Sequence, residues 1–141
     1  LVIKKSGVQY AIRLAYPKAI DRLNIFQASR QAMKRAATSL AEDYSLSKGI
    51  VLVDGPHKIS GLTLEQKPVI KGDQKVFAIA CASILAKVYR DKMMKRYAKK
   101  YSQYGFEKHM GYGTQFHYAQ LAVYGPSEIH RQSFQLSKKL I

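Results

Sequence analysis

Two neighbouring segments near the start of the chain have different hydrophobic periods. From Val8 to Tyr16, apolar side chains alternate with polar or small ones, and this period of two predicts a half-buried strand. From Pro17 onward, apolar residues recur at three and four positions, which predicts one amphipathic helix that ends before Ser45. The apolar face of this helix is formed by Leu23, Phe26, Met33, Ala37 and Leu40.

The centre of the chain carries two short apolar runs. GIVLVD, which ends at Asp54, is continuous and rich in β-branched residues, and it is typical of a fully covered central strand. GPHKISG, at 55–61, is expected to be a loop, and KPVIKG, at 67–72, a second short strand. Both runs lead directly to an aspartate, because the first ends at Asp54 and the second is followed by Asp73.

A second long helix is predicted from about Gln74, with Asp73 placed to cap its first turn. Its apolar positions are Phe77, Ala80, Cys81, Ile84, Leu85 and Val88. The later part of this helix, RDKMMKRYAKKY, is strongly basic. A short helix is predicted from Thr114 to Val123, followed by an irregular tail. The order strand, helix, strand, strand, helix predicts an α/β fold in which helices pack on a sheet.

The composition of the chain predicts a class of binding partner and a cellular compartment. A chain of 141 residues with 47% hydrophobic content has the usual size of one globular domain. Its formal charge of +15 favours a polyanion, nucleic acid before an anionic membrane. The longest nearly apolar run, Val76 to Ala86, is shorter than the roughly 20 residues of a membrane-spanning helix. Cys81 lies inside that run and is expected to be a small buried hydrophobe rather than a reactive thiol, and a reducing, cytoplasmic setting fits.

The two aspartates are the first candidates for chemistry. Sites in open α/β sheets collect at the carboxyl ends of strands, where Asp54 and Asp73 would share one rim. Taken singly, Asp54 is explained as a turn residue and Asp73 as a helix cap. Together, in a chain with few acids, they favour a site for Mg²⁺ or Mn²⁺. Two such ions, about 4 Å apart, can activate water and stabilise the leaving oxygen in phosphodiester hydrolysis.

Other polar residues are weaker candidates for a metal site. Asp91 is too far along its helix from Asp73 to share an ion, and it is expected to be partly buried and paired with a Lys or Arg. The four histidines lack the short spacing typical of zinc ligands. Tyr112, between Gly111 and Gly113, could stack on a sugar or a base, or could simply pack against the domain as a loop aromatic.

Six blocks of the sequence, in this order, resemble the bacterial ribonuclease HII family. They are IDRLNIFQASRQAM, VLVDG, KGDQK, AIACASILAKVYRDKMM, YGFEKHMGYGT and GPSEIHRQSF. The resemblance implies a ribonuclease H-like mixed sheet flanked by helices, and a monomer. It also implies an endoribonuclease that uses divalent metal to cut the RNA strand of RNA–DNA hybrids, or a duplex on the 5′ side of an embedded ribonucleotide.

The resemblance assigns roles to individual residues. Asp54 and Asp73 match two of the family's four metal-binding carboxylates, and Tyr112, with Gly111 beside it, matches the residue that packs against the sugar at the cut junction. Residues expected to contact phosphate or the DNA strand are Lys71, Lys108, His109 and Asn24. The single domain, 1–141, would then have an α/β core at about 10–105 and a substrate-contacting segment at 106–141.

The sequence departs from the family's pattern at its beginning. The family opens with a glycine-rich segment that contains adjacent Asp and Glu, followed by an Asp-Ser-Lys-Lys stretch, and neither is present here. The residues before Tyr10 resemble the end of the helix that follows those elements. The expectation is an N-terminally truncated ribonuclease HII that lacks its first strands and is inactive alone. The alternative is a non-catalytic basic fragment that binds duplex nucleic acid through phosphates.

Overall fold

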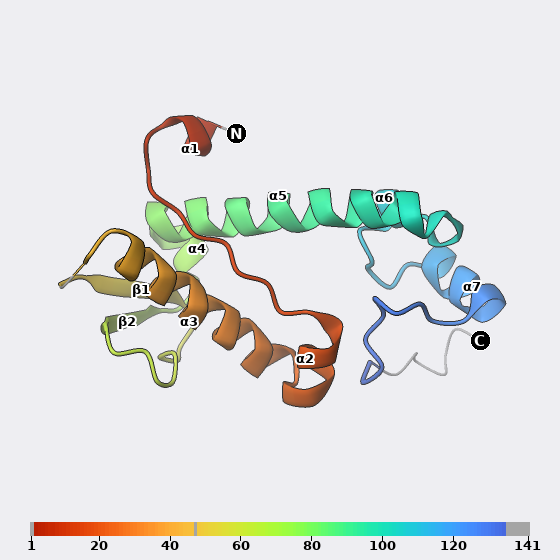
Figure 1. Ribbon diagram of the computed structural model, residues 1–141, viewed down its shortest axis with the longest axis horizontal. Helices are drawn as coiled ribbons and strands as arrows, with labels where there is room; N and C mark the ends of the chain where they lie inside the picture. Colours follow the sequence, from red (N-terminus) through yellow and green to blue (C-terminus); the bar gives the residue numbers. More distant parts are fainter. Residues whose placement is uncertain (1, 47, 135–141) are drawn as a thin grey trace. The chain divides into compact units, whose positions relative to one another are not determined.

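The computed structural model describes residues 2–46 and 48–134 of the chain (Figure 1). The chain divides into two compact units, the first ending at Ala86 and the second beginning at Lys87. The sequence predicted one domain with a core that reaches about residue 105. The division into units falls earlier than that, inside helix α5 (Phe77–Lys100).

A two-stranded parallel sheet forms the centre of the first unit. Strand β1 (Ile50–Asp54) pairs with β2 (Glu65–Val69), so that Asp54 lies opposite Val69. With helices beside this sheet, the α/β prediction is confirmed. The prediction that β1 is fully covered was wrong, because it has one neighbouring strand among the described residues and Val53 is its buried residue.

The core of the first unit lies between the sheet and helix α3 (Ile25–Asp43), which runs beside β1 and β2 in Figure 1. The buried residues are Val53, Ile59 and Leu62, and Ala37 of α3 packs against them. Gln66 of β2 holds the loop between the strands. Its side chain accepts from the Ile59 N–H at 2.7 Å and donates to the carbonyls of Ile59 and Leu62.

The first predicted helix is divided in two by Asn24. Helix α2 (Pro17–Leu23) ends there and α3 begins. Asn24 has a φ of +67°, and its side-chain oxygen accepts from the Gln27 N–H at 3.0 Å, which caps the start of α3. Within α3, Phe26 of the predicted apolar face is exposed, whereas Ala28, close to the start of the helix, is buried.

Residues 8–16 form neither helix nor strand, so the predicted first strand was wrong. A period of two favours an extended backbone, but a strand also needs a neighbour with which to form hydrogen bonds. This segment instead lies along α3, where the Arg35 guanidinium donates to the Leu14 carbonyl at 2.6 Å and Arg13 bonds to Ser39. A short helix, α1 (Val2–Lys5), precedes it, which agrees with the expected helical start.

The second predicted helix is also interrupted. A single turn, α4 (Gly72–Lys75), is followed by Val76 in an extended conformation and then by α5. Lys71, with a φ of +55°, occupies the position before α4. Asp73 lies inside the first turn, so the prediction that Asp73 is the cap was wrong. Phe77 of the predicted apolar face is exposed, whereas Leu85 is buried as expected.

The second unit has its own aromatic core. Tyr104, in the 3-10 turn η1 (Ser102–Tyr104), stacks on Phe106 of helix α6 (Phe106–His109) with 5.3 Å between ring centroids. Met94 and Ala98 of α5 complete the buried cluster. Because aromatic rings bury large areas, these two carry much of the packing of a small unit.

The last helix confirms its prediction to within a residue. Helix α7 (Gln115–Tyr124) begins after Thr114, whose hydroxyl accepts from the His117 N–H at 3.2 Å. The predicted partner of Asp91 is confirmed as well, because the Lys87 ammonium lies 2.7 Å from its carboxylate. Over the part of the chain that the structure describes, every helix is too short or too polar to cross a membrane.

Candidate functional site

The first candidate site lies at the carboxyl end of the parallel sheet. Strands β1 and β2 run in the same direction, so their carboxyl ends, at Asp54 and Val69, meet at one edge. The prediction that Asp73 closes a strand was wrong, because β2 ends at Val69 and Asp73 follows in α4. We call Asp54, Gly72 and Asp73 the carboxylate edge.

A hydrogen bond joins β1 to α4 at this edge. The Gly72 N–H donates to Asp54 Oδ1 at 2.8 Å. Gly72 is buried, and a Cβ atom there would lie 2.6 Å from Ile79 Cδ1 and 3.2 Å from Asp54 Oδ1. Glycine is therefore needed for the backbone to come so close. Asp54 is thus hydrogen-bonded to Gly72, the residue that precedes Asp73, and both aspartates are exposed.

The donor atoms of the carboxylate edge fit a hard divalent cation. Mg²⁺ is commonly held by one or two carboxylates, with water and substrate phosphate completing its coordination. Asp54 and Asp73 supply such a pair. No group of three or more His, Cys, Asp or Glu side chains gathers for a metal within residues 2–46 and 48–134. The exposed Lys71 and Lys75 on either side of Asp73 add positive charge that suits an incoming phosphate.

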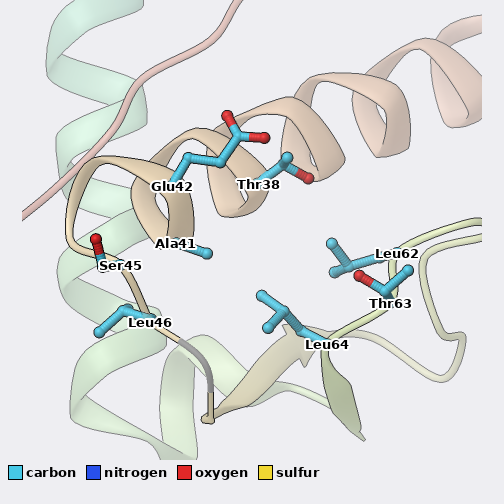
Figure 2. A pocket seen from close by; sticks show the side chains of 8 residues that line it. All are labelled: Thr38, Ala41, Glu42, Ser45, Leu46, Leu62, Thr63 and Leu64. Atoms are coloured by element: carbon cyan, nitrogen blue, oxygen red, sulfur yellow. The ribbon is translucent and has the colours of Figure 1, made fainter.

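Two hollows of the first unit have linings that leave out both aspartates. One, of about 410 Å³, lies between α3 and the loop after β1, and it contains Arg30, Lys34 and Lys58. Arg30 donates to the carbonyls of His57 and Lys58 there, so its guanidinium stabilises the loop. The other, of about 320 Å³, has a lining of aliphatic and polar side chains and is shown in Figure 2. It lies between the end of α3 and residues 62–64.

The second candidate site is the turn formed by Gly111, Tyr112 and Gly113, which we call the tyrosine turn. Tyr112 is 62% exposed, although Arg90 lies against it, with the guanidinium carbon 4.7 Å from the ring centroid. Arg90 also donates to the Met110 carbonyl at 2.8 Å. The Tyr112 ring is therefore exposed to solvent and supported on one side by Arg90. It does not pack into the unit as a buried loop aromatic would.

Lys108 and His109 were both predicted to lie near phosphate, but they differ in their exposure to solvent. Lys108 is exposed, with its ammonium 5.3 Å from the Phe116 ring centroid. His109 is 8% exposed, and its Nδ1 accepts from the Gly111 N–H at 3.2 Å while its Nε2 lies 2.8 Å from the Tyr104 carbonyl. The buried ring of His109 therefore supports the tyrosine turn from inside, and its burial does not fit a direct phosphate contact.

Two further histidines next to this turn were missed by the sequence analysis. His117 stacks on His109 with 4.5 Å between ring centroids, and its Nδ1 lies 3.0 Å from the Tyr112 carbonyl. His130 Nε2 lies 3.1 Å from His117 Nε2. Burial is the main cause that lowers the pKa of His117 and of His130 below the ordinary histidine value. Their wide spacing in sequence gives no local signal that the three rings meet.

A family sequence model and several known proteins that match this chain all belong to the same family. The sequence model of the family described as ribonuclease HII matches residues 2–137. A protein named ribonuclease HII from Chlorobium phaeobacteroides is 42% identical over 96% of this chain and 64% of its own length. A ribonuclease HII from Caldicellulosiruptor bescii is 48% identical over 94% of this chain and 62% of its own length. A ribonuclease HII from Endomicrobium trichonymphae is 46% identical over 94% of this chain and 61% of its own length. This chain thus spans less than two thirds of the length of these relatives. With matches of this identity and coverage, the chain belongs to the ribonuclease HII family.

Proposed function

We propose that this chain supplies the carboxylate edge and much of the nucleic-acid surface of a ribonuclease HII. Its activity would be hydrolysis of the RNA strand in RNA–DNA hybrids, and cleavage on the 5′ side of ribonucleotides embedded in duplex DNA. The observation that supports this proposal is the hydrogen bond from the Gly72 N–H to Asp54, because it ties the end of β1 to the backbone next to Asp73. We expect the protein to act as a monomer in the cytoplasm.

Asp54 and Asp73 are the proposed metal ligands of this chain. Bound Mg²⁺ or Mn²⁺ would supply Lewis acidity at the scissile phosphate and lower the pKa of water, and the proposed site would hold two such ions. The family's opening Asp-Glu segment would contribute the other two carboxylates. Asp54, with Oδ1 held by Gly72, and Asp73, exposed in α4, would orient the site, while Lys71 attracts the phosphate.

The nucleic-acid side of the proposal rests on charge and on Tyr112. Exposed cations of α5 in the second unit are Lys87, Lys92, Lys95, Arg96, Lys99 and Lys100. Such a basic helix binds phosphates without reading sequence, and its contribution to affinity falls steeply with salt. The exposed Tyr112 ring would then contact the ribose at the junction, with Lys108 close to it in sequence and Asn24 as a contact to the DNA strand.

Substitution of each aspartate in a longer protein tests the proposal. The protein is extended at its amino end by the family's glycine-rich Asp-Glu segment and its strands, and offered a duplex with a single ribonucleotide. Cleavage should require Mg²⁺ or Mn²⁺, and Asp54→Asn or Asp73→Asn should lower its rate by on the order of 100-fold or more. Glu42→Gln, an exposed acid of the same unit, should cleave normally. Cleavage that survives both aspartate changes would refute the assignment.

A second candidate is a non-catalytic chain that binds duplex nucleic acid. The charge of +15 and the exposed cations of α5 favour it, since both would act without a metal. For the 141 residues alone we expect salt-sensitive duplex binding with little or no cleavage. Robust metal-dependent turnover by the 141-residue chain would exclude this second candidate and show that two carboxylates suffice.

A further inference from the structure

The hydrogen bonds around the tyrosine turn determine which nitrogen of each ring carries the proton. A neutral imidazole has one donor and one acceptor nitrogen. His109 Nδ1 accepts from the Gly111 N–H, so its proton is on Nε2, which donates to the Tyr104 carbonyl. His130 Nδ1 accepts from the Ser127 N–H at 2.9 Å, so its proton is also on Nε2.

The remaining ring completes a directional chain. His130 Nε2–H donates to His117 Nε2 at 3.1 Å, which leaves the His117 proton on Nδ1. That proton is donated to the Tyr112 carbonyl at 3.0 Å. The chain thus runs from the Ser127 N–H through His130 and His117 to Tyr112, and every link is satisfied when both rings are neutral. A proton added to His117 Nε2 would face the donor of His130, so the link between the rings would break.

The tyrosine turn is restrained on its other sides as well. The Tyr112 carbonyl accepts a second bond, from the Thr114 N–H at 2.9 Å, and the Tyr112 N–H donates to the His109 carbonyl at 2.9 Å. A Cβ atom at Gly113 would lie 2.5 Å from Tyr118 Oη, so the backbone passes close to that ring. The backbone of Tyr112 is therefore held from inside while its ring faces solvent.

We propose that His117 and His130 are positioning residues whose neutral, hydrogen-bonded pair fixes the backbone of the tyrosine turn, and that acid pH weakens this support by breaking the link between the two rings. Through this backbone, the pair would orient Tyr112 for its contact with a ribose in a duplex. That functional part rests on the proposed function, whereas the control of the turn does not.

The groups around the pair give the direction of the pH effect. His109 of α6 stacks on His117, and the Tyr104 ring of η1 lies 4.9 Å from the His130 ring. The nearby carboxylate of Glu128 bonds to Lys100, at 2.8 Å, and to Tyr101. Burial lowers the pKa of both rings, so the unfolded chain binds more protons as pH falls through about 6.5. The pair therefore stabilises the turn above that pH, and this contribution is lost below it.

Imidazole nitrogen NMR of the 141-residue chain tests the proton assignment directly. At pH 7.5 we expect His117 protonated on Nδ1 and His130 on Nε2, with a coupling between the two Nε2 atoms across their shared hydrogen. We also expect the Thr114 amide to exchange with solvent more readily at pH 5.5, after correction for the intrinsic exchange rate. A His117 ring protonated on Nε2 at neutral pH, or unchanged protection at pH 5.5, would overturn the proposal.

Variants of His117 separate the hydrogen bond from the packing. His117→Asn can keep a donor near the position of Nδ1, whereas His117→Leu removes it. The leucine variant should raise the opening of the turn by about fivefold, the effect of one hydrogen bond, and the asparagine variant should restore part of the protection. His57→Leu, at an exposed histidine of the first unit, is the matched control. Equal protection in the leucine variant and the control would contradict the proposal.

Duplex binding then distinguishes this inference from the proposed function. The probe is a duplex with one ribonucleotide, compared with the same duplex made of DNA alone, without divalent metal. If His117→Leu loosens the turn and lowers the ratio of the two affinities, both proposals hold. If it loosens the turn and leaves the ratio unchanged, the control of the turn stands and the Tyr112 contact fails. Should the leucine variant not fold, the NMR of the unsubstituted chain decides.

Discussion

The carboxylate edge of the first unit and the tyrosine turn of the second each present exposed side chains, but they restrain them to different degrees. At the carboxylate edge, one hydrogen bond, from Gly72 to Asp54, links the strand to the helix that carries Asp73. At the tyrosine turn, the backbone beside Tyr112 is held by two neighbouring backbone groups and by His117, and its ring is supported by Arg90.

The difference follows from the chemistry that each region is proposed to perform. Carboxylates that share a cation repel each other until the ion neutralises them, so an edge with few internal bonds can adjust when the ion arrives. An aromatic ring that recognises a sugar carries no charge, and its discrimination depends on where it is held before binding. We therefore expect the carboxylate edge to respond to metal and the tyrosine turn to respond to packing and pH.

The largest effect on stability is expected beneath the tyrosine turn. Phe106 is 1% exposed and lies against Tyr104, His117 and His130. Phe106→Ala should lower the free energy of unfolding by about 3–5 kcal/mol, measured by urea denaturation. Phe77→Ala, at a phenylalanine that is 86% exposed, should change it by less than about 0.5 kcal/mol. Similar losses in both variants would show that the aromatic core does not stabilise the second unit selectively.

A smaller loss is expected at the carboxylate edge. Gly72→Ala places a methyl group 2.6 Å from the Ile79 Cδ1 atom, and relieving this contact should cost about 1–3 kcal/mol of unfolding free energy. Gly49→Ala is the matched control, because no atom lies within 4 Å of an added Cβ there. If the two alanine variants have the same denaturation midpoint, the close approach of Gly72 to Ile79 and Asp54 is not a constraint on the fold.

Removal of the exposed ring should affect recognition without affecting stability. Tyr112→Ala should leave the free energy of unfolding within about 0.5 kcal/mol. It should remove about 1–3 kcal/mol of the preference for a ribonucleotide-containing duplex over DNA alone, the usual range for a stacked ring. The two affinities are measured by fluorescence anisotropy at one salt concentration. An equal loss for both duplexes would show that Tyr112 packs and does not discriminate.

The smallest expected effect is the pH dependence of stability. Because burial lowers the pKa of His117 and His130, the unfolding free energy should fall as pH drops from 7.5 to 5.5. In a chain with both His117→Asn and His130→Gln, that slope should be shallower. The measurement is the urea midpoint at each pH. A slope that is unchanged by the two substitutions would assign the pH dependence to other groups.

The sequence predicted the α/β class, β1, α7 and the ion pair of Asp91, because each depends on local periodicity or on near neighbours. It predicted the first helix without its break at Asn24, because the sequence does not show that the backbone leaves the helical conformation at that residue. Residues 8–16 were predicted as a strand because period two does not show whether a pairing partner exists.

The candidate site shows the same limit. Asp54 and Asp73 stood out because aspartates at the ends of apolar runs are a local signal, and the structure adds the hydrogen bond that ties Asp54 to Gly72, the residue before Asp73. The support of Tyr112 by Arg90 and His117 could not be predicted, since those contacts join residues from three separate helical or turn segments. The role of His109 changed for this reason, because its burial depends on the aromatic core around it.

Paramagnetic broadening by Mn²⁺ tests the central claim most directly. In the 141-residue chain, stoichiometric Mn²⁺ should broaden the amide signals of Asp54, Gly72 and Asp73 before those of other acidic residues, and Asp54→Asn should abolish this selectivity. Broadening that first reaches the Lys87–Asp91 pair or Glu128, or that is unchanged in the Asp54→Asn variant, would contradict a cation site at the end of the parallel sheet.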